Sequence, residues 1–527
     1  MPRIFKKYWI MKKTFLPIFL IVASITHGFS QNPIDNGINS ITKNALKAQL
    51  TFISSDWFEG REAGSEGAYK AADYLASLFQ SENLSPYHSD SYFQTVPLIA
   101  YTTTNQLLKI SESTSTNRST LTFSEEDFSP SNIDRSINLE GKIFFAGYGI
   151  SQDSFNEIKN NKSSGKIMLR LTGIPGETDS TSVAFQKFKK FDAHYWHQHK
   201  QNTAQKAGVV AILEFNPNHP VFNIPDRDNT QKAPCEKIIT RKSSGIYRKQ
   251  IKLANHSNTS IPVIKISENV MAALLPNYKT IFEAYQQNAS NLKKSSKVTI
   301  SPEISFQASV KTKAFECRNV IAKIEGSEKP DEIIVVGAHY DHLGNYDGYI
   351  WNGADDNGSG AIGMMAIAKA FAATGVRPKR TVIFASWTAE ERGLFGSKYF
   401  LNTFKKTDQI KYYHNYDMIG RSYNPEKPDS AVALLYTKNW HQAEAHVKKA
   451  NETYQLGLKV NYSAWDDPTS GSDNAPFAKK GIPIMWFHTG GHPDYHMPSD
   501  HADKIDWTKF QNIVKASFAT LWELANE

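Results

Sequence analysis

The stretch "EIIVVGAHYD" (332–341) joins an unbroken apolar run to a histidine and an aspartate. Such a run is typical of a strand buried on both faces of a parallel sheet. Three further runs also lead to acidic or histidine residues: "TVIFASW" (381–387) before Glu390 and Glu391, "YYHNY" (412–416) before Asp417, and "IPIMWF" (482–487) before the loop "HTGGHPDYHMPSDH" (488–501). Helical patterns alternate with these strands, so we expect an α/β fold with a mixed, mostly parallel sheet flanked by helices.

The polar residues after these four strands indicate a metal site. In parallel α/β sheets ligands bind beyond the carboxyl ends of the strands, so these side chains are expected to meet at one edge. A purely structural set of ion pairs would need lysine or arginine partners, and almost none follow these strands. Histidine with carboxylate suits zinc best, and Co²⁺ or Mn²⁺ are candidate substitutes.

The octet "GADDNGSG" (353–360) sets Asp355 beside Asp356. Aspartate, asparagine and glycine are the commonest turn residues, so a solvated turn is the ordinary interpretation. The candidate ligands are nevertheless too many for one tetrahedral ion. They suit two zinc ions that share one carboxylate, with a bridging hydroxide neutralising the charge that remains.

The adjacent pair Glu390 and Glu391 suits two separate tasks, because neighbouring side chains do not face each other on a helix or tight turn. One carboxylate can bind metal while the other acts as general base, and the residue pattern does not say which. A solvated helix start is the alternative. In His339-x-Asp341 the imidazole would bind metal and the carboxylate would orient it.

Five segments in this order resemble the co-catalytic zinc aminopeptidases of peptidase clan MH, family M28: "GAHYDHLG", "GADDNGSG", "TAEERGLFGS", "YDMIG" and "YHMPSD". The resemblance covers about residues 40–95 and 315–527 and implies a zinc-exopeptidase-like fold. It implies two Zn²⁺ per chain, one held by His339 and Asp417, the other by Glu391 and His496, with Asp356 bridging both. It also implies Glu390 as general base, Asp341 as the residue that orients His339, and Asp355 as a supporting residue of the turn.

The histidine-rich loop offers His488, His492, His496 and His501. The family's Tyr-His-x-Pro-x-Asp pattern falls on "YHMPSD" and selects His496. We expect His342 and His492 to line the cleft or face solvent. In "GSDNAPF" (471–477) Asn474 stands where the family usually has histidine, which weakens any ligand role for that residue.

Residues 101–305 resemble a protease-associated (PA) domain inserted into the peptidase. The similar segments are "GKIFFAGYGI", "SGKIMLRLTG", "NTAQKAGVVAILEFN" and "IPVIKIS". Residues 31–100 and 306–527 would then form one peptidase domain, with the helical segment 40–95 packed on the C-terminal sheet. A β-rich spacer is the alternative. The histidines of "FDAHYWHQHK" (191–200), His194, His197 and His199, favour a polar helix face over a second metal site.

Residues 1–30 resemble a secretory signal peptide, with Lys12 and Lys13 before the apolar run 15–25. That run is too short for a mature bilayer-spanning helix. We therefore expect an exported protein, periplasmic or secreted, cleaved before Gln31, with a membrane anchor as the alternative. Cys235 and Cys317 are the only cysteines, and export permits either a disulfide or two free thiols.

The net charge of the chain is +8, but residues 1–30 contribute five basic residues and no acidic ones, which leaves +3 for the rest. A chain so close to neutral gives little reason to expect a nucleic acid or an acidic membrane as partner.

The sequence therefore predicts an exported di-zinc metallo-exopeptidase that hydrolyses N-terminal residues from peptides through the bridging hydroxide, with Glu390 as general base. The alternatives are a carboxypeptidase or dipeptidase, a glutaminyl-cyclase-like activity with one zinc, a non-catalytic receptor-like protein, and a two-metal phosphatase. Peptides are the expected partners. No stable membrane insertion is expected, and the oligomeric state is left open.

Overall fold

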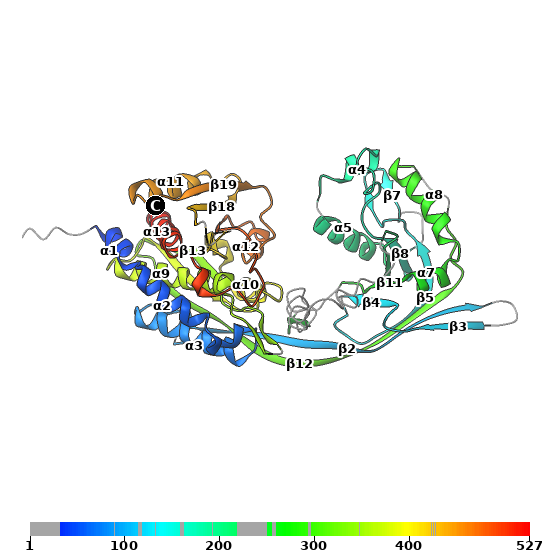
Figure 1. The fold of residues 1–527 in the computed structure, drawn as a ribbon, viewed down its shortest axis with the longest axis horizontal. Helices are drawn as coiled ribbons and strands as arrows, with labels where there is room; N and C mark the ends of the chain where they lie inside the picture. The colour runs from blue at the N-terminus through cyan, green and yellow to red at the C-terminus, as the bar shows by residue number, and fades with distance from the viewer. Residues whose placement is uncertain are drawn as a thin grey trace, which may run out of the picture.

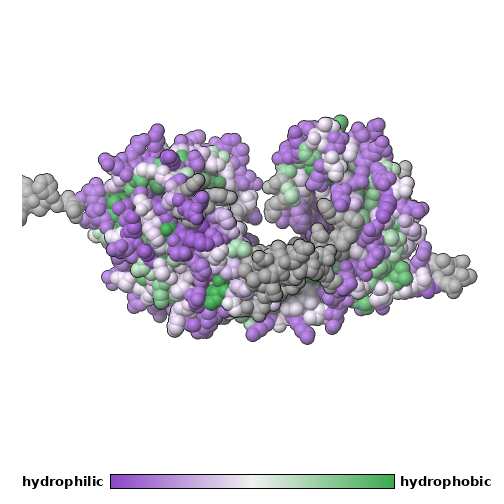
Figure 2. Space-filling view, viewed as in Figure 1, coloured by the Kyte–Doolittle hydropathy of each residue, from purple (hydrophilic) through white to green (hydrophobic). Residues whose placement is uncertain are grey.

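A long two-stranded ribbon joins two lobes in the computed structural model (Figure 1). Strands β2 (Phe93–Ser113) and β12 (Glu303–Ile324) pair antiparallel from Phe93↔Val320 to Ser111↔Glu303. The described residues are 32–88, 90–113, 118–131, 133–158, 163–191, 193–218, 250–255, 260–293, 297–346, 348–422, 424, 426 and 428–527. Figure 2 shows a gap between the upper parts of the two lobes.

The first lobe begins with the helical N-terminal segment. Its elements are α1 (Pro33–Ser40), α2 (Lys43–Ile53), the 3-10 helix η1 (Asp56–Arg61), α3 (Glu66–Ser81) and the short β1 (Ser85–Pro86). Thr42 caps α2 through the N–H of Ala45, and Ser65 caps α3 through the N–H of Ala68, because their hydroxyls accept donors that have no helical partner.

The sheet of the first lobe has the order β19-β18-β20-β17-β13-β16-β12. Its strands after β12 are β13 (Lys329–His339), β16 (Arg380–Trp387), β17 (Ile410–Tyr416), β18 (Ala431–Thr437), β19 (Lys459–Trp465) and β20 (Ile484–His488). Strands β16, β13, β17 and β20 run parallel, whereas β12 and β18 are antiparallel to their neighbours β16 and β20. This arrangement confirms the predicted mixed, mostly parallel sheet.

Helices cover both faces of this sheet. They are α9 (Gly360–Ala373), α10 (Phe395–Thr403), α11 (His441–Thr453), α12 (Asn474–Lys479) and α13 (Trp507–Asn526). The connections also contain three short helical turns, η2 (Ala354–Ser359), η3 (Thr407–Gln409) and η4 (Ala502–Lys504). Strands β14 (Gly344–Tyr346) and β15 (Tyr349–Trp351) form a separate hairpin. Nearly every side chain of α9 is buried, because α9 lies between the sheet and helices α1, α2, α3 and α13. Residues from α1, α2 and α3 share one hydrophobic core with the sheet.

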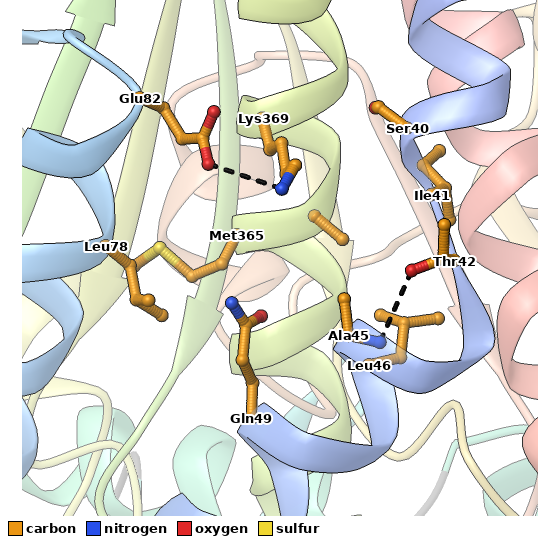
Figure 3. A pocket seen from close by; sticks show the side chains of 11 residues that line it. Ser40, Ile41, Thr42, Ala45, Leu46, Gln49, Leu78, Glu82, Met365 and Lys369 are labelled. Carbon is orange, nitrogen blue, oxygen red and sulfur yellow. Dashed lines mark hydrogen bonds and ion pairs between the residues drawn. The ribbon is translucent and has the colours of Figure 1, made fainter.

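The corner between α1 and α2 leaves only a small cavity against α9 and α3 (Figure 3). Its volume is about 20 Å³, which suits a single water molecule. Lys369 and Glu82 form an ion pair beside it, with Nζ and Oε1 separated by 3.5 Å. The cavity reflects close packing of the N-terminal helices and is too small for a substrate.

The second lobe has its own hydrophobic core, and its strands continue the sheet of the first lobe beyond β12. Its elements are β3 (Arg118–Phe123), β4 (Phe128–Ser131), β5 (Ile137–Phe145), β6 (Ser151–Gln152), β7 (Phe155–Asn156), β8 (Ile167–Leu171), α4 (Val183–Phe188), α5 (Ala193–Lys206), β9 (Ala211–Phe215), β11 (Val263–Ile266), α7 (Glu268–Leu274) and α8 (Tyr278–Ser290). Strand β10 (Gln250–Leu253) instead pairs with β2 and shares a hydrophobic cluster with Ala63 and Ala389 of the first lobe. Strands β5, β8, β9 and β11 are parallel neighbours. They contain the apolar runs from which the sequence predicted a β-rich insert.

Several predictions fall outside the described residues, namely the signal peptide at 1–30 and Cys235. Cys317 is buried. The helices that the structure describes include none long and apolar enough to cross a membrane. His199 lies on α5, as expected for a helical position, and its Nε2 is 3.0 Å from the carbonyl oxygen of Ser151.

Candidate metal centre

The strand ends of the first lobe bring five predicted ligands together. His339 is the last residue of β13, and Asp417 follows β17 directly. Asp356 lies in the turn η2, Glu391 follows β16, and His496 lies in the loop after β20. These five side chains are called the ligand cluster below.

One half of the ligand cluster forms around His339. Its Nε2 lies 3.5 Å from Oδ1 of Asp356 and 3.4 Å from Oδ2 of Asp417. One atom from each of the three residues lies within 4.8 Å of the others, a spacing that suits one metal ion. The His339 ring donates from Nδ1 to the carbonyl oxygen of Asp341 at 3.1 Å, which leaves Nε2 for the cluster.

The other half forms around Glu391. Nε2 of His496 lies 3.1 Å from Oδ2 of Asp356 and 3.3 Å from Oε2 of Glu391. Nδ1 of His342 lies 2.8 Å from Oε1 of Glu391 and 3.7 Å from Oδ2 of Asp356. The His342 side chain is buried against the ligand cluster, so of its two expected positions, lining the cleft or facing solvent, the second is wrong.

Asp356 is shared by both halves. Its Oδ1 faces His339, and its Oδ2 faces His496 and His342. The backbone around Asp356 is held from behind, because Oδ2 of Asp500 accepts the N–H groups of both Asp355 and Asp356 at 3.0 Å. Asp500 is the last residue of the "YHMPSD" pattern, but the sequence predicted no role for it.

The carboxylate of Asp355 points away from the ligand cluster. Its Oδ1 accepts the N–H of Gly420 at 2.7 Å, and its Oδ2 lies 3.2 Å from Nε2 of His492. His492 is buried beside Arg421, with Nδ1 and Nη1 separated by 3.2 Å, so it does not face solvent. These contacts support the turn that carries Asp356.

Glu390 lies beside the His339 half, with its Oε2 3.9 Å from Nε2 of His339. Oδ1 of Asp341 accepts the backbone N–H of Glu390 at 3.0 Å. The same Oδ1 is 3.9 Å from Nδ1 of His339, so the Asp341 carboxylate contacts the Glu390 backbone more closely than the imidazole it was expected to orient. Asp341 thus connects His339 and Glu390.

The surroundings of Glu390 and Glu391 shift the pKa values of the two carboxylates in opposite directions. Burial, reinforced by Glu391 and Asp473, raises the pKa of Glu390 well above its usual value. Burial also favours the neutral form of Glu391, but hydrogen bonds from His342 and His496 outweigh it and hold the pKa of Glu391 well below its usual value. Two neighbouring carboxylates are therefore suited to different protonation states.

The neighbouring carboxylates raise the pKa values of two histidines of the ligand cluster. Burial by itself lowers the pKa of His339, but Glu390, Asp417 and Asp356 reverse the effect and raise it well above 6.5. Burial opposes charge on His496 as well, yet Asp356 and Glu391 raise its pKa to about 10. Imidazole nitrogens and carboxylate oxygens are zinc ligands, and two divalent ions would relieve this concentration of negative charge. The donor set therefore fits zinc.

Asp473 is a further buried acid near the His339 half, and the Ser397 hydroxyl donates to it. Burial raises the pKa of Asp473 to about 6. The next residue, Asn474, holds its own loop, since its amide donates to the carbonyls of Pro468 and Ser470 at 2.8 and 2.9 Å. These contacts give Asn474 a structural role in place of a ligand role.

Comparison with known proteins identifies similarity over the part of the chain that holds the ligand cluster. Residues 319–521 match the model of peptidase family M28. Leupeptin-inactivating enzyme 1 of Streptomyces exfoliatus is 30% identical over 210 residues, 40% of this chain and 43% of that protein. Leucine aminopeptidase 2 of Trichophyton rubrum is 32% identical over 176 residues, 33% of each chain. The chain thus spans less than half the length of these curated relatives.

The fold is similar over almost the whole chain to the aminopeptidase from Aneurinibacillus sp. strain AM-1. The superposition covers 94% of this chain and 96% of that chain, with a TM-score of 0.54 and 18% sequence identity.

Proposed function

We propose that the chain, whose residues 319–521 match the model of peptidase family M28, is a zinc-dependent aminopeptidase that releases N-terminal residues from peptides. The observation that carries the proposal is the position of Asp356, whose two oxygens face two separate sets of histidine and carboxylate ligands. The names of the relatives support an aminopeptidase, because leucine aminopeptidases are among them.

We assign His339 and Asp417 to one zinc ion, Glu391 and His496 to the other, and Asp356 to both. When bound, such a pair of ions lowers the pKa of water and polarises a carbonyl group. The number of ions and this division of the ligands are part of the proposal. His342 supports Glu391 from the side opposite to His496, consistent with the 2.8 Å contact.

Glu390 is the proposed general base. Its burial and neighbours favour a bound proton, whereas Glu391 is held ionised. In the proposed reaction Glu390 takes a proton from the attacking water and returns it to the departing amine. Asp341 is a positioning residue, because it fixes the backbone of Glu390 and contacts the ring of His339.

The test combines metal analysis with a set of matched peptides. We expect about two zinc ions per chain and hydrolysis of peptides with a free N-terminus, including those with an amidated C-terminus. N-acetylated versions of the same peptides should resist hydrolysis. Cleavage that instead requires a free C-terminus, or persists after N-acetylation, would contradict the aminopeptidase assignment.

Export and the role of the insert are further parts of the proposal. The basic and apolar pattern of residues 1–30 supports a signal peptide removed before Gln31, which N-terminal sequencing of the protein from its native host would test. We also propose that the second lobe, the PA-like insert, limits which peptides enter. Kinetics on peptides of increasing length test this role, since unchanged kcat/KM across the series would contradict it.

A further inference from the structure

Arg61 lies far from the ligand cluster in sequence but is completely buried beside it. It ends the 3-10 helix η1 of the N-terminal segment. All four of its hydrogen bonds run to backbone carbonyl groups: Nε to Tyr340 at 2.7 Å, Nη1 to Ile53 at 2.9 Å and Asn352 at 2.7 Å, and Nη2 to Gly353 at 2.9 Å. Burial lowers the pKa of the guanidinium to about 10, so it stays charged at neutral pH.

Three of the four carbonyls that Arg61 binds belong to two ligand-bearing loops, and the fourth, that of Ile53, ends helix α2. Tyr340 lies between His339 and Asp341, and Gly353 comes directly before the turn that holds Asp356. The backbone of Arg61 also takes part, since its own carbonyl accepts the N–H of His342 at 3.2 Å. One planar side chain thus ties the His339 loop to the Asp356 loop.

The residues on either side of Arg61 reach the same region. Glu62 forms an ion pair with Arg392, which follows Glu391 directly. At Gly60 a Cβ atom would lie 2.5 Å from the carbonyl oxygen of Gly344 and 2.6 Å from that of Trp351. Gly60, Arg61 and Glu62 therefore contact the loops that carry His339, Asp356 and Glu391.

We propose that Gly60-Arg61-Glu62 is a clamp that sets the spacing of the ligand-bearing loops, with Arg61 as its positioning residue. The proposal rests on the proposed function in one respect only: it takes the ligand cluster to bind zinc. A guanidinium presents its donors in a fixed fork, so four carbonyls bound by one such group are held at a defined separation. Without it, several buried carbonyls would lose their partners and the loops would relax.

The sharpest test is Arg61→Gly combined with rescue by free guanidinium. Arg61 has a φ of +52°, which glycine adopts without strain, so this variant removes the side chain and spares the backbone. We expect zinc affinity, measured by competition with a chelator, to fall about 10- to 100-fold, the range found for residues that support metal ligands. The kcat for peptide hydrolysis should fall by a larger factor than the factor by which KM changes.

Guanidinium chloride, far below unfolding concentrations, should restore much of the zinc affinity by filling the space left in Arg61→Gly, whereas potassium chloride and urea should not. Arg377→Gly, which removes an exposed arginine, is the matched control and should behave as wild type. Unchanged zinc affinity in Arg61→Gly, or a loss that guanidinium fails to reverse, would overturn the clamp.

Arg61→Lys serves if the glycine variant does not fold. Lysine keeps the charge but not the fork, so zinc affinity should again fall, and wild-type affinity in this variant would refute the role of Arg61. Because zinc affinity is measured apart from catalysis, a wild-type protein that binds zinc but cleaves no peptide would reject the proposed function and leave the test of the clamp intact.

Discussion

Nε2 of His496 lies 3.1 Å from Oδ2 of Asp356, although the two residues belong to loops that follow different strands of the sheet. The other oxygen of the same carboxylate is directed to His339. Asp356 is therefore the one side chain whose loss should affect both halves of the ligand cluster. Substitutions of the other ligands can therefore test each half of the proposed metal centre separately.

Replacing Glu390 with glutamine should abolish most of the activity while leaving zinc bound. Glutamine keeps the shape of the side chain but cannot accept and return a proton, and general acid–base catalysis contributes about 10²- to 10⁴-fold. We expect kcat to fall by about that factor. Steady-state kinetics with metal analysis measure both effects, and Glu283→Gln, on the exposed side of α8, is the control. Wild-type kcat in Glu390→Gln would exclude this base.

His496→Asn and His342→Asn should differ in metal content. His496 is within 3.3 Å of both Asp356 and Glu391, whereas His342 approaches only Glu391 that closely. We therefore expect His496→Asn to lose about half of the bound zinc and His342→Asn to retain it with weaker affinity. Elemental analysis after dialysis measures the zinc content of both variants. Loss of zinc in His342→Asn but not in His496→Asn would show that His342, and not His496, is the ligand.

The stability of the metal-free protein should fall as pH rises. Burial raises the pKa of Asp341 to about 7, and the carboxylates around His496 outweigh its burial and raise its pKa to about 10. In the unfolded chain these groups titrate near about 3.9 and about 6.5. The folded protein thus binds more protons than the unfolded chain between about pH 4 and pH 10, and the free energy of unfolding declines across that window.

Zinc should reverse this trend, because the ligands must lose their protons to bind metal, so zinc affinity rises with pH. Urea unfolding of the metal-free and zinc-loaded protein across this pH range measures both effects. A metal-free protein that becomes more stable between about pH 5 and pH 9 would contradict the assigned shifts.

Gly60→Ala should cost far more stability than Gly375→Ala. The two glycines share a left-handed backbone, with φ of +70° and +71°, but a Cβ at Gly375 meets nothing within 4 Å. Strain alone predicts a loss of about 1 kcal/mol for Gly375→Ala. Gly60→Ala adds overlap with two backbone carbonyls, and we expect a loss above about 3 kcal/mol together with weaker zinc binding. Equal losses in thermal or urea unfolding would contradict the close approach at Gly60.

The strands of the first lobe were predictable because their signal is local. Residues 333–338 and 382–385 are continuously apolar, which is typical of a strand buried on both faces, and they lie in β13 and β16. The long ribbon of β2 and β12 was not predictable. Its polar middle, such as Lys311–Lys313, carries no periodic pattern, and its pairing partners are distant in the chain.

The candidate site was predictable to the level of residue type and order. The motifs indicated which residues follow each strand, and the structure brings the five of them together. The orientation of His342 was not predictable, because it lies beyond the end of β13, where the alternation of side chains along a strand no longer applies. Asp500 was missed because its contacts with Asp355 and Asp356 are made across two loops.

For the parallel strands of the first lobe, the sequence by itself determined which segments are strands and which acids and histidines follow them, since apolar runs and turn composition act over a few residues. Tertiary structure alone decided that the two oxygens of Asp356 face different histidines and that Arg61 reaches the carbonyl of Tyr340, 279 residues away. Such contacts depend on the packing of the whole lobe: a buried guanidinium is stable only where several carbonyls converge on it, and no local pattern encodes that convergence.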